Sequence, residues 1–337
     1  MIMAITFFLA FATAIVTAGF VTPLIRKLAT KAQFVDVVDD RRMHAEPKPR
    51  LGGLAIYLGF AFALFVSIGV ALKTSPTLFH RADDIHDALG LLFGGTMIVI
   101  VGVWDDVMGM RARTKFISQL VVAVVSMSYG FIISGFDVPF VHQYVNVPIW
   151  IGIPLTALWY IGMMNAINFL DGLDGLLAGV TAISGLFLFA IAIGHGHLVP
   201  ALILCALVGA ATGFLPYNFN PAKIILGDTG SLFIGYVFAT VSIIVTAKVA
   251  ITVSLLVPLV ALALPVVDTA VAIGRRLRAG RSIASPDRGH LHHLLIFKFG
   301  LNVRQAVLLI YAVSFVLGAA AYALSGGLPH ARAHGIL

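Results

Sequence analysis

The sequence predicts an all-α polytopic membrane protein, with about ten transmembrane helices in a single integral-membrane domain that spans residues 1–337. Hydrophobic residues make up 60% of the chain and charged residues only 11%, whereas a soluble domain is about half apolar and a quarter charged. Apolar runs close to the ~20 residues that a bilayer requires recur along the whole chain. We therefore expect lipid, rather than a water-driven globule, to set the packing of the core.

Ten apolar stretches have the length of a membrane span. The first lacks a basic leading region and a clear cleavage site, so we interpret it as a retained helix. Residues 135–148 alternate apolar and polar side chains, which predicts a short hairpin between two spans. Cys205 is the only cysteine, which excludes an intrachain disulfide and a cysteine metal cluster. The predicted spans are residues 2–23, 51–72, 88–104, 116–135, 149–164, 176–193, 199–215, 231–247, 251–273 and 304–325.

The distribution of lysine and arginine predicts the orientation of these spans. Of the 22 such residues, 17 fall in one set of alternate loops, at 24–50, 105–115, 165–175, 216–230 and 274–303, and Arg304 at the entrance to the last span makes 18. Cytoplasmic loops carry the excess of positive charge, so we expect these loops in the cytoplasm and both termini outside. The net charge of +7 follows from this bias, with anionic lipid or substrate as a second contributor, and does not indicate nucleic-acid binding.

The most informative stretch is residues 165–175, between two apolar runs. Its polar residues recur at every third position, which on a helix would form one slowly drifting stripe: Asn165, Asn168, Asp171 and Asp174. A carboxylate facing the centre of the bilayer costs about 2.5–3.5 kcal/mol, so the stripe is expected to face water, protein or a ligand. Gly172 and Gly175 would let a ligand or another backbone approach these carboxylates.

Two further segments combine carboxylates or glycines with basic residues. Residues 36–53 include Lys48, Arg50 and a glycine pair, which suit anionic oxygens approached by the main chain, although a basic loop that only sets topology remains the simpler interpretation. The third span ends in adjacent aspartates, followed by Lys115. Adjacent positions on a helix point to different faces, so we expect different roles for the two aspartates, Asp105 and Asp106.

The later loops add a glycine-flanked aspartate and a histidine cluster. Asp228 is either an N-cap or a ligand or metal residue whose flanking glycines leave backbone N–H groups free to meet phosphate. The 274–303 loop lacks cysteines and zinc-type spacing, so its histidines favour hydrogen bonding to sugar and phosphate. Asp268, in the ninth span, is interpreted as a buried partner of a basic residue. The candidate binding residues of this loop are Arg288, His290, His292 and His293.

Taken in order, the segments resemble the polyprenyl-phosphate N-acetylhexosamine-1-phosphate transferase family, most closely its bacterial undecaprenyl-phosphate N-acetylglucosamine-1-phosphate transferases. Any one segment is a weak pattern, but five in order are specific. The loop reads His-Leu-His-His rather than three consecutive histidines, which favours the branch that uses simple aminosugars. The matching segments are residues 44–53, 105–116, 165–175, 227–231 and 286–293.

The resemblance implies a helical bundle in the bacterial inner membrane, with a cytoplasmic active site. It implies a UDP-N-acetylhexosamine donor, undecaprenyl phosphate as acceptor, and Mg²⁺ as cofactor with Mn²⁺ as an alternative; a homodimer is left open. Asp228 matches the metal-binding residue and His290, His292 and His293 the sugar- and phosphate-recognition loop. The remaining matches are the catalytic Asp105 and Asp106, and the nucleotide and active-site residues Asn168, Asp171 and Asp174.

The implied reaction transfers N-acetylhexosamine-1-phosphate, with N-acetylglucosamine favoured, to the lipid phosphate and releases UMP, as the first membrane step of a cell-surface glycan pathway such as lipopolysaccharide or cell-wall polysaccharide synthesis. The phosphate contacts expected from charge are Lys48, Arg50, Lys115 and Arg288. Direct attack is favoured, and a covalent aspartyl-phosphate route stays open. The alternatives are a membrane prenyltransferase, which would need repeated Asp-x-x-x-Asp patterns, and a secondary transporter, which would show internal symmetry.

Overall fold

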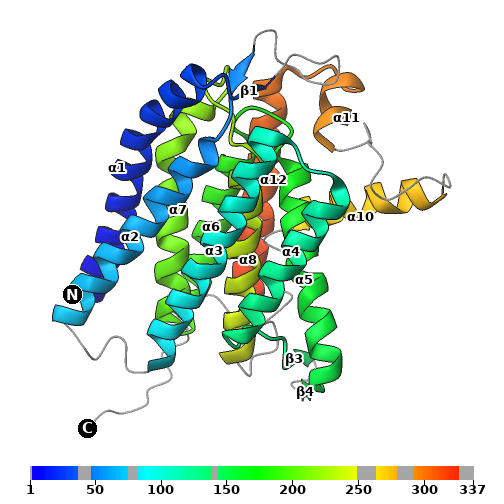
Figure 1. Ribbon diagram of the computed structural model, residues 1–337. Helices are drawn as coiled ribbons and strands as arrows, with labels where there is room; N and C mark the ends of the chain where they lie inside the picture. The colour runs from blue at the N-terminus through cyan, green and yellow to red at the C-terminus, as the bar shows by residue number, and fades with distance from the viewer. Residues whose placement is uncertain are drawn as a thin grey trace.

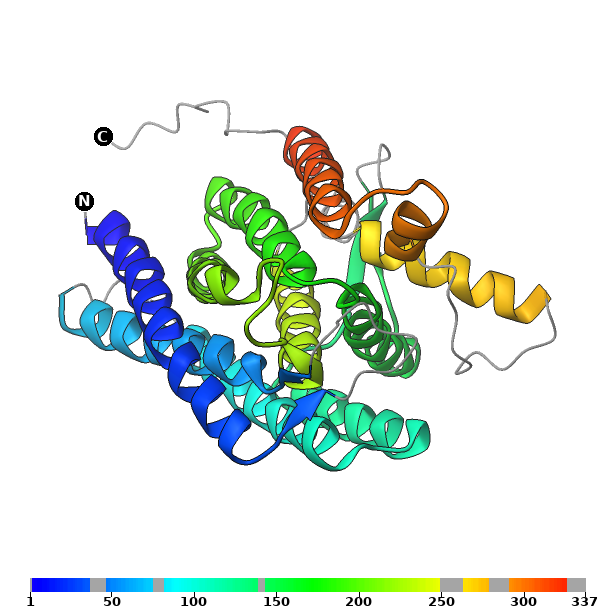
Figure 2. The same ribbon diagram turned by 90° about the horizontal axis from the view of Figure 1, so that it is seen from above.

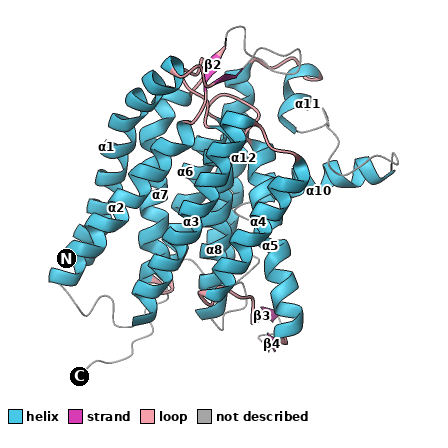
Figure 3. Ribbon diagram, in the orientation of Figure 1, coloured by secondary structure: helices cyan, strands magenta, loops and turns pink. Residues whose placement is uncertain are grey.

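The computed structural model is a bundle of long helices (Figure 1). It describes residues 2–36, 47–74, 82–138, 143–248, 263–278 and 291–325. Eight helices within these ranges are long and apolar enough to cross a membrane, which confirms an α-helical polytopic membrane protein. Secondary structure outside the helices is limited, in the described part of the chain, to short strands (Figure 3).

Most of the long helices overlap the predicted spans, with ends that differ by up to eight residues. Their bounds are α1 (Ile2–Lys31), α2 (Gly52–Thr74), α3 (Ala82–Met108), α4 (Ala112–Ser128), α5 (Ile149–Leu170), α6 (Leu176–Gly194), α7 (Leu198–Asn218), α8 (Gly227–Lys248), α10 (Ala263–Arg278), α11 (Leu291–Phe297) and α12 (Val303–Leu324).

Two predicted spans differ from the structure. The fourth, expected at residues 116–135, is the 17-residue α4, which ends at Ser128 where the chain turns toward a hairpin. The ninth was expected at residues 251–273, of which 251–262 lie outside the described residues. The described remainder belongs to α10, which lies across the bundle instead of along it (Figures 1 and 2). Its last turn carries three arginines, and such charges favour the polar boundary of a membrane over its core.

Two short antiparallel strand pairs lie at opposite ends of the bundle (Figure 1). Strands β3 (Gly135–Val138) and β4 (Gln143–Asn146) form the hairpin that the alternating pattern predicted. At the other end, β1 (Val35–Asp36) pairs with β2 (Lys48–Pro49), which the sequence did not predict because each strand has only two residues. The second pair holds Lys48 at the end of the bundle where the carboxylates and basic residues of the predicted segments gather.

Helix α8 occupies the centre of the bundle, against α3, α5 and α2 (Figure 2). Its polar side chains are satisfied internally, as the absence of water in a bilayer core requires. The fully buried rings of Tyr160 and Tyr236 stack with centroids 5.6 Å apart. The Tyr160 hydroxyl bonds Thr240 at 3.0 Å, and Ser126 donates to the Tyr236 hydroxyl at 3.2 Å. This rigid centre fixes the position of the N-terminus of α8.

The starts of α2 and α8 meet backbone to backbone. The Gly52 and Gly53 N–H groups donate to the carbonyls of Ile225 and Leu226 at 2.9 and 2.8 Å. A Cβ atom on Gly53 would lie 2.0 Å from the backbone nitrogen of Gly230, so this position excludes any side chain. The glycine pair therefore brings two helix starts together, rather than exposing its own N–H groups to an anion as the sequence suggested.

We expect Gly53→Ala to destabilise the protein by about 3 kcal/mol, the upper range for overpacking, because the clash is with backbone that cannot rotate away. It should also lower activity, since the same contact places Asp228 and Thr229. Gly69→Ala is the matched control: a Cβ at Gly69 in the same helix meets nothing within 4 Å. Thermal unfolding in detergent measures both. Equal melting temperatures for the two variants would contradict the close-approach argument.

Candidate active site

The ends of α3 and α5 and the starts of α2, α4 and α8 meet at the end of the bundle that carries β1 and β2 (Figure 1). Lys115, near the start of α4, joins the first two predicted segments. Its Nζ lies 3.0 Å from Asp105 Oδ2 and forms a second ion pair with Asp228 Oδ2. One cation therefore bridges two carboxylates whose positions are 123 residues apart in the chain.

Asp228 is held from a second side by α5. The Asn168 side-chain amide donates to Asp228 Oδ1 at 2.6 Å and to Ser231 Oγ at 2.7 Å. The Asp228 side chain nevertheless keeps 29% of its surface exposed, so a ligand can reach it from solvent. Asp228 is thus oriented by two neighbours and remains accessible, which suits a residue that contacts phosphate-bound cation or substrate.

Asp106 and Asp105 contact different groups, as expected for adjacent positions on a helix. The Oδ1 of Asp106 accepts the Asp228 N–H at 2.9 Å, and its Oδ2 accepts the N–H and hydroxyl of Thr229 at 2.9 and 2.6 Å. A carboxylate that caps the first N–H groups of a helix also meets the positive end of the helix dipole. Asp106 is only 8% exposed. The N–H groups expected to be free for phosphate are therefore occupied by Asp106.

The 165–175 stretch is not one helical stripe. Helix α5 ends at Leu170 and Asp171 is its C-cap, so Asp171 and Asp174 lie in the turn before α6. Gly175 closes that turn at φ +81°, a left-handed conformation that glycine adopts without strain. Asn165 donates to Gln119 Oε1 on α4 at 2.8 Å. The polar residues recur at every third position, but the prediction that they share one helical face was wrong, because the helix ends within the stretch.

Asp174 is buried, and one of its carboxylate oxygens accepts three hydrogen bonds. Its Oδ2 accepts from Lys48 Nζ at 2.8 Å, from the Asn220 amide at 3.1 Å and from the Ala222 N–H at 3.0 Å. These donors come from β2 and from the segment that follows α7. Asp174 thus fixes three chain segments around one oxygen, and Lys48 belongs to this second cluster instead of the Lys115 cluster.

Asp171 differs from the other carboxylates of the site. Within the described residues, its side chain accepts no hydrogen bond and forms no ion pair. Burial raises the pKa of Asp171 well above its ordinary value, and the charges of three nearby carboxylates add to this shift: Asp228, Asp106 and Asp174. An ionised Asp171 would be stabilised by a cation or by a substrate donor placed beside it.

The raised pKa of Asp171 predicts a pH dependence of stability. The folded state holds this proton more tightly than the unfolded chain, so stability should fall as pH rises from about 3.9 toward the folded pKa. Asp171→Asn removes this proton uptake. In EDTA, the variant should melt above the wild type at pH 7, and the difference should shrink toward pH 4. A difference that does not change with pH would contradict the assignment.

Comparisons with known proteins identify the family of the chain. A family model described as glycosyl transferase family 4 matches residues 88–246, which contain Asp105, Lys115 and Asp228. A probable undecaprenyl-phosphate N-acetylglucosaminyl 1-phosphate transferase of Bacillus subtilis is 36% identical over 315 residues, covering 94% of this chain and 84% of that protein. The chain belongs to glycosyl transferase family 4. The resemblance drawn from the motifs is thereby confirmed.

Other members of glycosyl transferase family 4 are similar over nearly the same length. The decaprenyl-phosphate N-acetylglucosaminephosphotransferase of Mycolicibacterium smegmatis is 35% identical over 324 residues, covering 89% of this chain and 77% of the relative. The undecaprenyl-phosphate alpha-N-acetylglucosaminyl 1-phosphate transferase of Escherichia coli is 30% identical over 298 residues, with 87% and 77% coverage. The similarity extends well beyond the segments that carry the motifs.

The donor set of this family 4 member fits a hard divalent cation with few protein ligands. Within the described ranges, no three histidine, cysteine, aspartate or glutamate side chains converge closely enough to hold a metal alone. Mg²⁺ is often bound through one or two carboxylates, with water and substrate phosphates as its other ligands. The partly exposed Asp228 and Asp171, which has no partner among the described residues, are carboxylates of that kind. The residues therefore fit Mg²⁺ only together with a phosphorylated substrate.

The structure describes only some of the remaining predicted binding residues. Arg50 reaches the cluster from the start of α2, with a guanidinium nitrogen 3.4 Å from the backbone oxygen of Asp106. His293 lies on α11 and stacks on Phe297, with ring centroids 5.8 Å apart. Asp268 accepts the Leu291 N–H at 2.9 Å and so anchors the start of α11. Arg288 and His290 lie outside the described residues, as does the side chain of His292.

Several polar residues of the family 4 site were not assigned roles from sequence. Thr229 and Ser231 were part of a quoted motif, yet only the structure shows them bonded to Asp106 and Asn168. Asn218 accepts the Gly175 N–H at 3.1 Å, and from α12 the Tyr311 hydroxyl donates to the Gly175 carbonyl. Arg304, also on α12, donates to the Asn220 carbonyl at 3.0 Å. Asparagines at the end of an apolar span were the available signal, because buried polar residues in membrane proteins are usually functional.

Proposed function

We propose that this protein transfers N-acetylglucosamine-1-phosphate from UDP-N-acetylglucosamine to undecaprenyl phosphate. An oxygen of the lipid phosphate forms a bond to the β-phosphorus of the donor, and the bond from that phosphorus to the oxygen bridging to the α-phosphate breaks. The products are undecaprenyl-diphosphate-N-acetylglucosamine and UMP. The names of the relatives support the transferred group and the polyprenyl phosphate acceptor.

The observation that carries this proposal is the Lys115 bridge between Asp105 and Asp228, within reach of solvent. Two phosphorylated reactants must approach each other, so the main task is to neutralise their charge and align them. Lys115 can exchange a carboxylate for a phosphate oxygen without moving far, and Arg50 lies beside the same cluster. Asp106 and Asn168 hold Asp228 in place while this exchange occurs.

Asp105 is suited to position the acceptor and to remove its residual proton. The second pKa of a phosphate monoester is about 6, so most of the acceptor is already a dianion at neutral pH. A strong general base is therefore unnecessary. Mg²⁺, held by Asp228 together with the donor diphosphate, would neutralise charge on the transferring phosphoryl group and the leaving UMP.

The site end of the bundle is proposed to face the cytoplasm of a bacterial inner membrane. Helix α1 begins and α12 ends at the opposite end (Figure 1). Basic residues concentrate at the site end, in the turn before α4, at the end of α10 and beside β2, as the positive-inside bias requires. A nucleotide sugar made in the cytoplasm would reach the site directly.

The test is UMP release by purified protein, with undecaprenyl phosphate and a panel of UDP-sugars. We expect release with UDP-N-acetylglucosamine, loss of release in EDTA and recovery on adding Mg²⁺. Release that requires no lipid phosphate would contradict the acceptor, and release that survives EDTA would contradict the cation. Sugar flux into proteoliposomes without UMP formation would contradict the transferase assignment altogether.

A further inference from the structure

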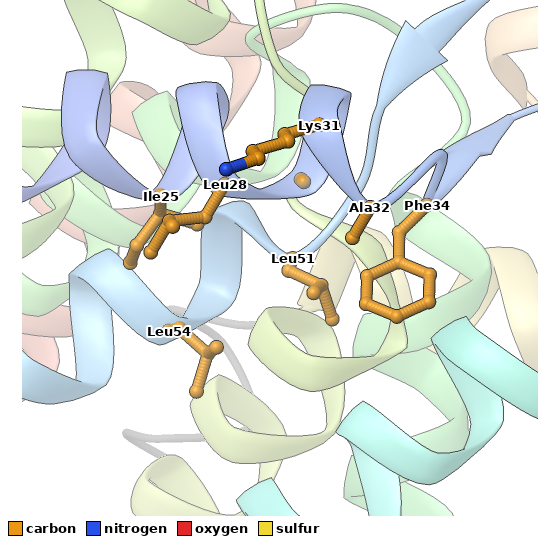
Figure 4. A pocket seen from close by; sticks show the side chains of 8 residues that line it. Ile25, Leu28, Lys31, Ala32, Phe34, Leu51 and Leu54 are labelled. Atoms are coloured by element: carbon orange, nitrogen blue, oxygen red, sulfur yellow. The ribbon is translucent and has the colours of Figure 1, made fainter.

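An apolar pocket lies beside the active site, between the end of α1 and the start of α2 (Figure 4). Its volume is about 480 Å³, and its lining includes Ile25, Leu28, Phe34, Leu51 and Leu54. This volume is within the ~300–1,000 Å³ range of pockets that hold small ligands. The pocket is open on one side and sits at the end of a candidate membrane span, where the alkyl chains of lipids are available.

The shape of the pocket depends on an unusual backbone conformation. Leu51 has φ +74°, which is rare for a residue with a bulky side chain. The Leu51 side chain lines the pocket, whereas the preceding Arg50 reaches the Asp106 carbonyl. The Arg50 N–H also donates to the Phe34 carbonyl at 2.9 Å, which ties the two walls together. A conformation of this kind persists only when the surrounding structure enforces it.

One edge of the pocket is cationic. The Lys31 side chain runs back along α1 and its amine ends beside Leu28 (Figure 4). Lys27 is one turn earlier on the same flank of α1, because residues four apart are neighbours on a helix, and both lysines are exposed. Among the described residues, neither lysine has an acidic or hydrogen-bonding side-chain partner. Lys31 therefore stands at the edge of an apolar pocket with Lys27 one turn away on α1, and no described residue neutralises either charge.

We propose that this pocket binds an anionic phospholipid, with an acyl chain among the leucines and the headgroup phosphate on Lys27 and Lys31. Apolar volume lies beside lysines that have no partner among the described residues, at the end of a span, and this arrangement is complementary to such a lipid. A zwitterionic lipid has the same chains but lacks the net charge. The isoprenoid tail of the acceptor fits less well, since its phosphate belongs at the Lys115 cluster and not at these lysines.

The test measures lipid retention by the full-length protein, using native mass spectrometry with dioleoylphosphatidylglycerol or dioleoylphosphatidylcholine. We expect the wild type to retain the phosphatidylglycerol preferentially. Each lysine near a membrane surface contributes about fivefold in affinity for anionic lipid, so Lys27→Gln with Lys31→Gln should weaken retention roughly 25-fold. Ala32→Trp, which fills the pocket from an exposed position, should abolish the preference.

Arg111→Gln with Arg113→Gln is the matched control, because it removes the same charge from two exposed positions at the same end of the molecule. These variants should retain the phosphatidylglycerol as the wild type does. Equal loss in the lysine and arginine pairs, or unchanged retention in the lysine pair, would overturn the proposal. Displacement of the phosphatidylglycerol by equimolar undecaprenyl phosphate would assign the pocket to the acceptor and overturn it as well. None of these readouts depends on UMP release, so the transferase proposal is tested separately.

Discussion

The Asp228→Asn variant should release UMP about 10²–10³ times more slowly than the wild type, the loss typical of removing one group that stabilises transition-state charge. The amide keeps an oxygen for Asn168 but cannot pair with Lys115 or bind a divalent cation as an anion. The variant should still fold, because the side chain is partly exposed and Asn168 keeps an acceptor. Loss of the ion pair with Lys115 should lower its stability by no more than about 1 kcal/mol, since a partly exposed pair contributes about 0–1 kcal/mol.

The measurement combines UMP release at several Mg²⁺ concentrations with thermal unfolding of the same preparation. Asp137→Asn is the matched control, since it makes the same chemical change in β3 at the opposite end of the bundle. Rescue of Asp228→Asn to wild-type rates by added Mg²⁺ would show that Asp228 sets only affinity for the cation. Full activity at every Mg²⁺ concentration would refute the metal assignment.

The sequence predicted the helical architecture and the convergence of distant segments at one end of it. The prediction of helices did not depend on helix periodicity, because a run of ~20 apolar residues in a bilayer has few alternatives to an α-helix. Polar groups at span ends then had to gather where water or ligand is available. Asp105, Lys115, Asn168 and Asp228 were all expected near one another, and the structure places them in direct contact.

The sequence could not separate residues that contact a ligand from residues that hold them in place. The sequence does not distinguish Asp106 and Asp174 from Asp228 as ligand-binding carboxylates. In the structure, however, both accept hydrogen bonds from backbone and side-chain donors. The sequence indicated that an anion could approach the main chain at Gly53, whereas in the structure the backbone of Gly230 occupies that space. Such assignments depend on which neighbour fills the space beside a residue, and that neighbour can lie 46 to 126 positions away in the chain.

The orientation of α10 was unpredictable for a related reason. Its residues continue an apolar run and were counted as part of a ninth span. The guanidinium of Arg276 lies 5.7 Å from the centre of the Phe169 ring on α5, and Arg276 is only 5% exposed. A cation over an aromatic ring is favourable when desolvated, and it holds α10 against the side of the bundle. A hydropathy average scores these residues by type alone and does not include the contact between Arg276 and Phe169.

Asp106→Asn should lower stability as well as activity, and it should lower stability by more than Asp228→Asn does. An amide places an NH₂ group where one carboxylate oxygen accepts a hydrogen bond, so at least one buried N–H of Asp228 or Thr229 faces a donor. An unsatisfied buried polar group costs about 1–3 kcal/mol, and the favourable interaction of the carboxylate with the start of α8 is lost as well. The first turn of α8 then shifts, and Asp228 moves with it.

Thr229→Val provides the graded comparison, because it removes only the 2.6 Å hydroxyl donor to Asp106 and leaves both backbone donors in place. We expect a loss of about 0.5–1.5 kcal/mol, the usual value of one hydrogen bond, and a smaller fall in UMP release. Unfolding and UMP release measured on both variants should therefore decline together. If Asp106→Asn instead lost activity while keeping wild-type stability, Asp106 would have to act on the substrate itself, and its position as a buried cap of α8 would no longer explain its part in the reaction.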